Sequence, residues 1–231
     1  MNNYDLTRMV VTISIILIIV VFAFNKILLK NKPITTKFIT RTAIFASMAI
    51  ILYLVPFLKI KLPFFPAFLE VHLDEVPLLI AGFAYGPLSA FLGILIKTLV
   101  KLPMTTTLGV GELADFIYSC AFIIPTAFIY KKHRTFKGML ISISIGTLIQ
   151  LITSSFITTF LILDFYMFVM NLPRQAIMGM ITKAGININS LSWPFFFAVA
   201  IPFNAFKDAI VIVVTILLYK RLHILVEKAS N

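Results

Sequence analysis

The stretch that decides the fold is Val76-Pro-Leu-Leu-Ile-Ala-Gly-Phe-Ala-Tyr-Gly-Pro-Leu-Ser-Ala-Phe-Leu-Gly-Ile-Leu-Ile-Lys-Thr-Leu-Val100. If this stretch formed one membrane-spanning helix, the basic segments 26–41 and 131–137 would lie on opposite faces of the membrane. That arrangement contradicts the rule that Lys and Arg gather on the cytoplasmic face. As two short helices, the stretch puts both segments on one face. A break at Gly86 and Pro87 is favoured, because proline disfavours a helical residue before it and glycine supplies a turn. We therefore predict two helices.

The whole chain is too apolar for a soluble globule. Of its 231 residues 60% are hydrophobic, against about 45–50% in soluble domains. Other apolar blocks span residues 9–24, 38–58, 113–130, 139–163 and 193–219, near or above the roughly 20 residues that cross a bilayer. We predict an all-α, multi-pass membrane helix bundle. It has a six-helix core in residues 38–231 and one extra N-terminal transmembrane helix, with a basic loop, in residues 1–37.

The distribution of charge indicates topology rather than a nucleic-acid partner. The net charge is +11, and the segments assigned to the cytoplasm carry twelve basic residues and one acid, Glu227. These basic residues are Lys26, Lys30, Lys32, Lys37, Arg41, Lys131, Lys132, Arg134, Lys137, Lys220, Arg221 and Lys228. The remaining charges balance on the outer side. We therefore expect an outer N-terminus, a cytoplasmic C-terminus and no nucleic-acid binding.

Lys207 and Asp208 are ionisable residues within the last apolar block. Such groups are costly in a membrane and indicate function by default. Helical rise places the pair in the outer half of the bilayer. One interpretation is structural: the two residues form a mutual ion pair, or the lysine side chain extends to the membrane interface. The other is functional: they line a ligand pocket that is open to the outside.

A polar segment follows the helix that ends with Lys97 and Lys101. Thr107, Gly109 and Glu112 lead into the next helix, where hydroxyls, glycine amides and a helix N-terminus suit a polar ligand. Ordinary helix capping explains the same residues equally well.

Aromatic residues crowd the first outer loop, at Phe64, Phe65 and Phe68. A solvated loop does not need them, so they either cover an apolar or aromatic ligand or anchor the loop at the lipid interface. In the preceding helix, Thr42, Ala43, Ala46 and Ser47 form a stripe of small residues. Such stripes let helices approach closely, either within the bundle or at a partner protein.

Enzyme motifs are missing from the sequence. It contains no nucleophile elbow, no His-Glu-x-x-His and no Walker phosphate loop. His72, Asp74 and Glu75 could hold a metal, but solvated loop residues explain them more simply, so we expect no metal and no cofactor. If the protein drives uptake, partner proteins supply the energy.

Three stretches occur in the order seen in a known family. They are Leu62 to Leu88, Thr105-Thr-Thr-Leu-Gly-Val-Gly-Glu-Leu-Ala-Asp-Phe116 and Ile201-Pro-Phe-Asn-Ala-Phe-Lys-Asp208. The chain resembles the riboflavin-type substrate-binding (S) subunits of energy-coupling factor (ECF) transporters. The resemblance implies a six-helix, non-enzymatic subunit in a bacterial cell membrane. It binds a vitamin from outside and works with a transmembrane coupling (T) protein and two cytoplasmic ATPases.

The resemblance also implies residue roles. Asn204 and Lys207 contact the polar part of the ligand, the first outer loop covers it, and the small-residue helix meets the T protein. This chain has Thr158-Thr159-Phe160 where the family usually has Asn-Tyr-Phe, and Asp164-Phe165-Tyr166 where it has Pro-Leu-Tyr. We expect Thr158 and Tyr166 at the ligand. Another vitamin such as pantothenate is the alternative within the family, and a metal-dependent membrane enzyme acting on lipid or isoprenoid substrates is the alternative outside it.

Overall fold

The computed structural model describes residues 35–105 and 107–230. The extra transmembrane helix predicted in residues 1–37 lies outside the described residues, apart from the last three positions of that range.

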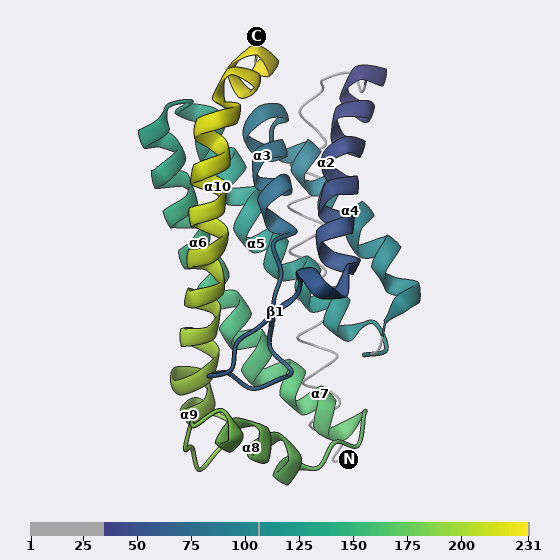
Figure 1. Cartoon of the computed structure of the whole chain (residues 1–231), viewed down its shortest axis with the longest axis vertical. Helices are drawn as coiled ribbons and strands as arrows, with labels where there is room; N and C mark the ends of the chain where they lie inside the picture. Colours follow the sequence, from purple (N-terminus) through teal and green to yellow (C-terminus); the bar gives the residue numbers. More distant parts are fainter. Residues whose placement is uncertain (1–34, 106, 231) are drawn as a thin grey trace. The chain divides into compact units, whose positions relative to one another are not determined.

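The described chain is an all-helical membrane bundle with one small hairpin (Figure 1). Its α-helices are α2 (Thr36–Leu54), α3 (Glu75–Tyr85), α4 (Pro87–Lys101), α5 (Val110–Lys132), α6 (Phe136–Ile157), α7 (Leu163–Phe168), α8 (Arg174–Lys183), α9 (Trp193–Phe195) and α10 (Ile201–Ser230). The π-helical turns η3 (Thr158–Ile162) and η4 (Phe196–Ala200) join α6 to α7 and α9 to α10. Five of the described helical segments are long and apolar enough to cross a membrane: Thr36–Leu54, Pro87–Met104, Val110–Lys132, Phe136–Phe168 and Trp193–Arg221. The predicted multi-pass helical class is therefore confirmed.

The break predicted at Gly86 and Pro87 is confirmed. α3 ends at Tyr85, Gly86 adopts a φ of 89°, and Pro87 is the first residue of α4. A positive φ suits glycine, which has no Cβ to clash. The short helix α3 is buried at every residue from Glu75 to Ala84 and contacts α2, α4, α5 and α10. Its neighbours therefore shield its polar ends from lipid.

The two ends of the bundle differ in charge. The start of α2, the turn between α5 and α6 and the C-terminal part of α10 lie at one end (Figure 1), which we call the basic end. Lys37, Lys131, Lys132 and Lys220 belong to these segments. We call the opposite end, where α8 and α9 lie (Figure 1), the pocket end.

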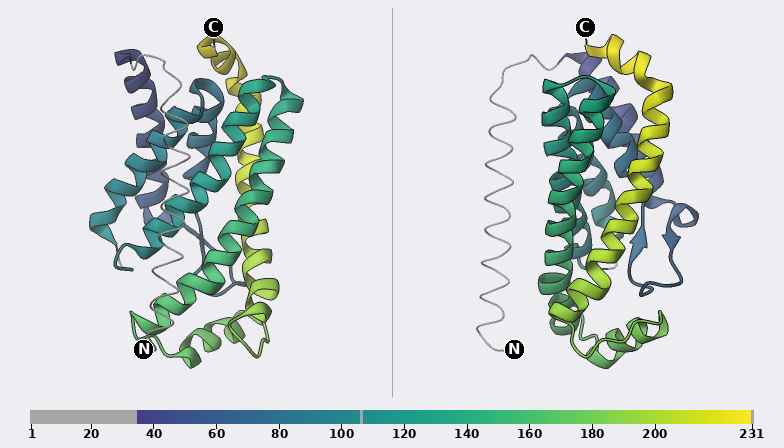
Figure 2. Two further views of the ribbon diagram at one scale, coloured as in Figure 1. Left: turned by 180° about the vertical axis from the view of Figure 1, so that it is seen from behind. Right: turned by 90° about the vertical axis from the view of Figure 1, so that its left-hand side faces the viewer.

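Two elements toward the pocket end were not predicted from the sequence. Strands β1 (Ile60–Lys61) and β2 (Glu70–Val71) form an antiparallel hairpin. Helix α8 runs across the end of the bundle that lies opposite to the C-terminus of α10 (Figure 2). Ile177 and Ile181, one helical turn apart on α8, pack into an apolar cluster with residues of α7, α9 and η4. Both elements are too short to show up as apolar blocks of membrane length.

The small-residue stripe of α2 is divided between the interior and the surface. Thr42 and Ala46 are buried, and the Thr42 hydroxyl lies 2.8 Å from the Ser89 hydroxyl of α4. Ala43 and Ser47 are exposed. Internal packing therefore uses half of the stripe, and the exposed half remains available to a partner.

Helices α5 and α6 approach closely at Gly146. A Cβ on Gly146 would lie 2.6 Å from the Phe122 carbonyl oxygen and would also collide with the Thr126 hydroxyl. Gly146→Ala is therefore expected to destabilise the protein by about 1–3 kcal/mol through overpacking, seen as a lower melting temperature in detergent. Gly179→Ala on α8 is the control, because nothing lies within 4 Å of its Cβ position. Equal melting temperatures for the two variants would contradict this account of the α5–α6 contact.

Candidate functional site

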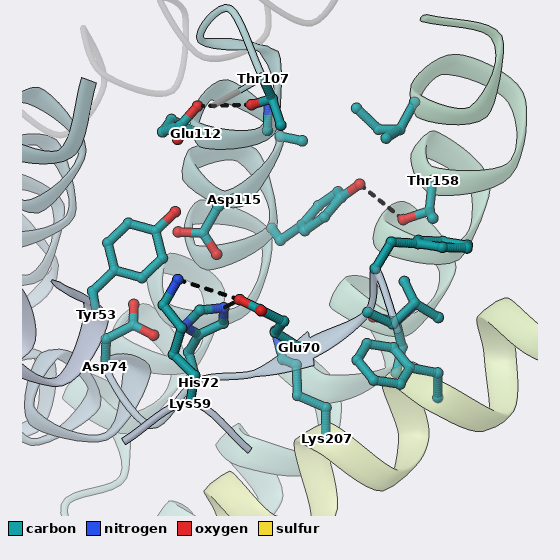
Figure 3. A pocket seen from close by; sticks show the side chains of 18 of the residues that line it. Tyr53, Lys59, Glu70, His72, Asp74, Thr107, Glu112, Asp115, Thr158 and Lys207 are labelled. Atoms are coloured by element: carbon teal, nitrogen blue, oxygen red, sulfur yellow. Dashed lines mark hydrogen bonds and ion pairs between the residues drawn. The ribbon is translucent and has the colours of Figure 1, made fainter. Parts of the chain in front are cut away.

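A cavity of about 390 Å³ opens toward the pocket end, between α2, α4, α5, α10, the hairpin and the η3–α7 segment (Figure 3). Its lining is Tyr53, Lys59, Phe68, Leu69, Glu70, His72, Asp74, Lys101, Thr107, Gly111, Glu112, Ala114, Asp115, Tyr118, Thr158, Ile162, Tyr166, Phe203, Asn204 and Lys207. Cavities of this volume hold small organic ligands. The lining combines aromatic, hydroxyl and charged side chains.

Seven of the eleven residues predicted at a ligand meet at this cavity. They are Phe68, Thr107, Glu112, Thr158, Tyr166, Asn204 and Lys207. The first and last of them, Phe68 and Lys207, are more than 130 positions apart in the chain. The fold therefore brings residues from distant segments together at one cavity.

The other four predicted residues lie around the cavity rather than on its wall. Lys97 is fully buried behind it, and Gly109 is the N-cap residue just before α5, with a φ of 86°. Phe64 and Phe65 pack against α10, with ring centroids 5.6 Å from Phe206 and 5.3 Å from Phe203. The Phe65–Phe203 contact reaches the wall indirectly, because Phe203 itself lines the cavity.

A buried ionic cluster forms the inner wall. Lys97 Nζ donates to Asp74 Oδ2 at 2.5 Å, to Asp115 Oδ2 at 2.7 Å and to the Ser119 hydroxyl at 3.2 Å. The same ammonium group lies 4.8 Å from the centre of the Tyr53 ring, a cation–π distance. One buried cation therefore holds two carboxylates in place at the cavity.

Lys207 pairs with an acid on another helix, and not with its neighbour Asp208, which was one of the alternatives left open by the sequence. Its Nζ lies 3.4 Å from Glu75 Oε1, and Gln150 Nε2 donates to the same oxygen at 3.0 Å. Asp208 is fully buried, and neither of its carboxylate oxygens has a hydrogen-bond partner among the described residues. The mutual Lys207–Asp208 ion pair is therefore absent from the described structure, and Lys207 instead joins α10 to α3 beside the cavity.

The polar segment before α5 is both a cap and part of the wall. Glu112 Oε2 accepts hydrogen bonds from the hydroxyls of Thr105 at 2.6 Å and Thr107 at 3.1 Å. The backbone amide of Gly111 donates to Thr107 at 3.0 Å. Because Thr107, Gly111 and Glu112 also line the cavity, the capping and ligand-surface interpretations describe the same residues.

The two π-helical turns lie where their helices pass the cavity. The Thr158 hydroxyl, in η3, is 3.0 Å from the Tyr118 hydroxyl. Asn204, one turn after η4, donates from Nδ2 to the Ala200 carbonyl at 2.8 Å and to the Ser155 hydroxyl at 3.2 Å. π-Turns often mark functional sites, because an extra residue redirects side chains. Here they accompany two wall residues.

The hairpin is fastened by Glu70. Its carboxylate lies 3.2 Å from both Lys59 and Lys61 across the strands, and His72 lies 3.8 Å away. Burial opposes ionisation, but the hydrogen bonds from the two lysines hold the pKa of Glu70 below its ordinary 4.5. A carboxylate with a depressed pKa stabilises the folded state above its unfolded pKa and loses this effect as the pH falls through the folded value. The ion pairs of Glu70 with Lys59 and Lys61, which we call the clasp, are therefore intact at neutral pH.

Several wall residues were not anticipated from the sequence. Tyr53, Tyr118 and Phe203 lie inside apolar blocks, where an aromatic residue looks like ordinary core. Lys59 and Glu70 look like solvated loop charges until the hairpin pairs them. The described residues contain no cluster of three or more His, Cys, Asp or Glu side chains suited to a metal ion.

Comparison with known proteins agrees with this architecture. Residues 37–219 match the family described as "ECF transporter, substrate-specific component". The riboflavin transporter RibU of Staphylococcus aureus (strain TCH60) is 29% identical over 176 residues, covering 76% of this chain and 86% of that protein. The riboflavin transporter FmnP of Bacillus subtilis (strain 168) is 26% identical over 196 residues, covering 84% and 97%.

A solved structure shares the fold. It is described as "Structure and mechanism of the S component of a bacterial ECF transporter", superposes with a TM-score of 0.63 at 26% identity, and covers 81% of this chain and 95% of its own. The family consists of non-enzymatic transport proteins of bacterial membranes that work with an ECF module of T protein and ATPases. The metal-dependent enzyme considered from the sequence is therefore excluded. The chain, a multi-pass membrane protein, belongs to the substrate-specific components of ECF transporters.

Proposed function

We propose that the protein captures riboflavin in the cavity and presents it to its ECF module for import. The observation that carries this proposal is the lining itself, in which aromatic rings and hydrogen-bonding groups share one cavity. Riboflavin combines a flat aromatic ring system with a chain of hydroxyl groups. The names of the two curated relatives support the same vitamin.

The lining offers partners for both parts of such a ligand. Phe68, Tyr166 and Phe203 provide apolar faces for the ring system, and Asn204 and Lys207 provide donors. Thr158 supplies a hydroxyl that can donate or accept. A mostly apolar cavity with a few placed polar groups is typical of small-molecule sites.

The orientation proposed from the charges makes the basic end cytoplasmic and the pocket end external. In this arrangement α3 counts as a sixth core helix, enclosed by its neighbours, and the apolar residues 9–24 add a further N-terminal transmembrane helix. The cavity then faces the side from which a vitamin is taken up.

Delivery is proposed to require a T protein and two cytoplasmic ATPases. The chain has no Walker phosphate loop of its own, so ATP must be hydrolysed elsewhere. The exposed small side chains of Ala43 and Ser47 on α2 allow a partner helix to approach closely. We propose this face as the T-protein contact, supported from within by the buried Thr42 and Ala46.

Titration of purified protein into riboflavin tests the proposal, because flavin fluorescence changes on burial among aromatic residues. The expected result is saturable binding with a Kd below about 1 μM, unaffected by excess pantothenate. Binding of pantothenate in place of riboflavin would overturn the choice of vitamin. Binding of neither would overturn the proposed ligand class.

Glu70→Gln is expected to speed riboflavin release about two- to fivefold. The substitution keeps the shape of the side chain and removes its charge, which weakens the clasp to Lys59 and Lys61; partly exposed pairs contribute little each. Stopped-flow fluorescence measures the rate. Lys183→Gln on α8, outside the cavity lining, is the control, and equal release rates in both variants would contradict the clasp.

A further inference from the structure

Four buried side chains that carry oxygen atoms lie where α3, α6 and α10 pack together. They are Glu75 of α3, Gln150 and Ser154 of α6, and Asp208 of α10, each at most 1% exposed. None of the four lines the cavity. We call them the oxygen cluster.

One carboxylate oxygen joins the three helices at this place. Gln150 Nε2 donates to Glu75 Oε1 at 3.0 Å, and Lys207 Nζ lies 3.4 Å from the same oxygen. Lys207 precedes Asp208 in α10. Gln150 and the start of the Lys207–Asp208 pair therefore both lie beside Glu75.

The alignment of α6 with α10 brings Asp208 to the level of Gln150. The two helices run antiparallel, since the start of α6 and the end of α10 both lie at the basic end (Figure 1). Asn204 Nδ2 donates to Ser155 Oγ at 3.2 Å, which fixes their register. About one turn closer to the basic end, α10 reaches Asp208 and α6 reaches Gln150. The four members of the oxygen cluster therefore lie close together in the interior.

Most of the oxygen atoms in the cluster have no donor. Glu75 Oε2, Gln150 Oε1, Ser154 Oγ and both carboxylate oxygens of Asp208 have no hydrogen-bond partner among the described residues. Carboxylate and amide oxygens only accept hydrogen bonds, so the Ser154 hydroxyl is the sole donor in this set. Buried polar atoms are normally paired, and an exception indicates a bound water molecule or ion.

The charges of the cluster do not balance. Glu75 and Asp208 contribute two carboxylates, and Lys207 is the only basic side chain of the described residues that forms an ion pair with either of them. A buried charge without a counter-charge is strongly destabilising. A bound cation with a single positive charge would restore the balance.

We propose that the oxygen cluster binds one sodium ion, which ties α10 to α3 and α6. Hard cations take oxygen ligands, and the cluster offers carboxylate, amide and hydroxyl oxygens together. A monovalent ion matches the charge of the cluster, whereas a divalent ion would leave an excess of positive charge beside Lys207. The amide of Gln150 and the hydroxyl of Ser154 stand in for a third acidic ligand.

The melting temperature of the purified full-length protein at constant ionic strength tests this site. Exchange of N-methyl-D-glucamine chloride for sodium chloride at about 100 mM is expected to raise it by about 3–6 °C, the shift for a Kd near 10 mM. Potassium, a larger ion, is expected to give a smaller shift at the same concentration.

Two variants locate the ion. Asp208→Asn keeps the shape of the side chain and removes its charge, so the melting temperature should no longer depend on sodium. Ser154→Ala keeps both carboxylates and removes one oxygen ligand, so the half-saturating sodium concentration should rise severalfold. Asp164→Asn on α7, outside the oxygen cluster, is the matched control and should keep the full shift.

The outcomes distinguish sodium from other ways of neutralising Asp208. Equal melting temperatures of the wild type in the two salts overturn the site. If the melting temperature instead falls as the pH rises from about 6 to about 9, a proton neutralises the carboxylate. A sodium shift that persists in Asp208→Asn also overturns the site, and Ser154→Ala decides if Asp208→Asn fails to fold. None of these outcomes depends on which vitamin the cavity binds.

Discussion

Lys97→Met is expected to lower the free energy of unfolding by about 3–5 kcal/mol, the largest loss of stability predicted for this protein. The side chain is fully buried and holds Asp74 and Asp115 through its ammonium group. Methionine fills a similar volume but leaves two carboxylates facing each other without a cation. The melting temperature in detergent measures the loss.

Two further variants of the protein show whether the lost charge or the lost packing causes this loss of stability. Lys101→Met, one turn along α4, removes a cation that lies 5.8 Å from the Tyr53 ring centre and should cost about 1 kcal/mol or less. Lys97→Met combined with Asp74→Asn and Asp115→Asn should recover most of the lost stability, because no unpaired charge remains. A triple variant as unstable as Lys97→Met would contradict the ionic role.

Lys207→Ala is expected to weaken riboflavin binding by a factor of about 10–150. The variant removes a charged donor from the cavity wall and leaves Glu75 buried without its cation, and hydrogen bonds to charged groups contribute about 1.5–3 kcal/mol. Part of the loss comes from disturbance of the α3–α10 contact. Fluorescence titration measures the affinity.

Adding Glu75→Gln to Lys207→Ala separates binding from folding. The neutral amide removes the unpaired carboxylate, so the double variant should regain thermal stability while binding riboflavin as poorly as Lys207→Ala. Lys220→Ala, on the same helix at the basic end, is the control and should bind normally. Recovery of full affinity in the double variant would show that Lys207 acts only on stability.

The sequence predicted those parts of the fold that charge and hydropathy determine. Helix positions followed from the apolar blocks, and the break at Gly86 and Pro87 followed from keeping the basic segments on one face. The structure confirms that break. These features depend on how apolar and basic residues are distributed along the chain, which a single sequence displays directly.

Pairing between distant charges could not be predicted from the sequence. Lys97 meets Asp74 and Asp115, and Lys207 meets Glu75 across 132 positions, whereas adjacency in the chain suggested Lys207 with Asp208. Successive helical residues point in directions about 100° apart, so neighbours in sequence seldom face each other. Tyr53 and Tyr118 of the cavity wall were missed because an aromatic residue in an apolar block packs equally well in a core.

The visible absorption spectrum of the protein, purified in detergent from riboflavin-containing cultures, tests the central claim most directly. A tight site retains its ligand through purification, so the wild type should show the absorption band of an oxidised flavin in proportion to protein, and Lys207→Ala should lack it. A colourless wild type that also fails to take up added riboflavin would contradict the claim that this cavity captures the vitamin.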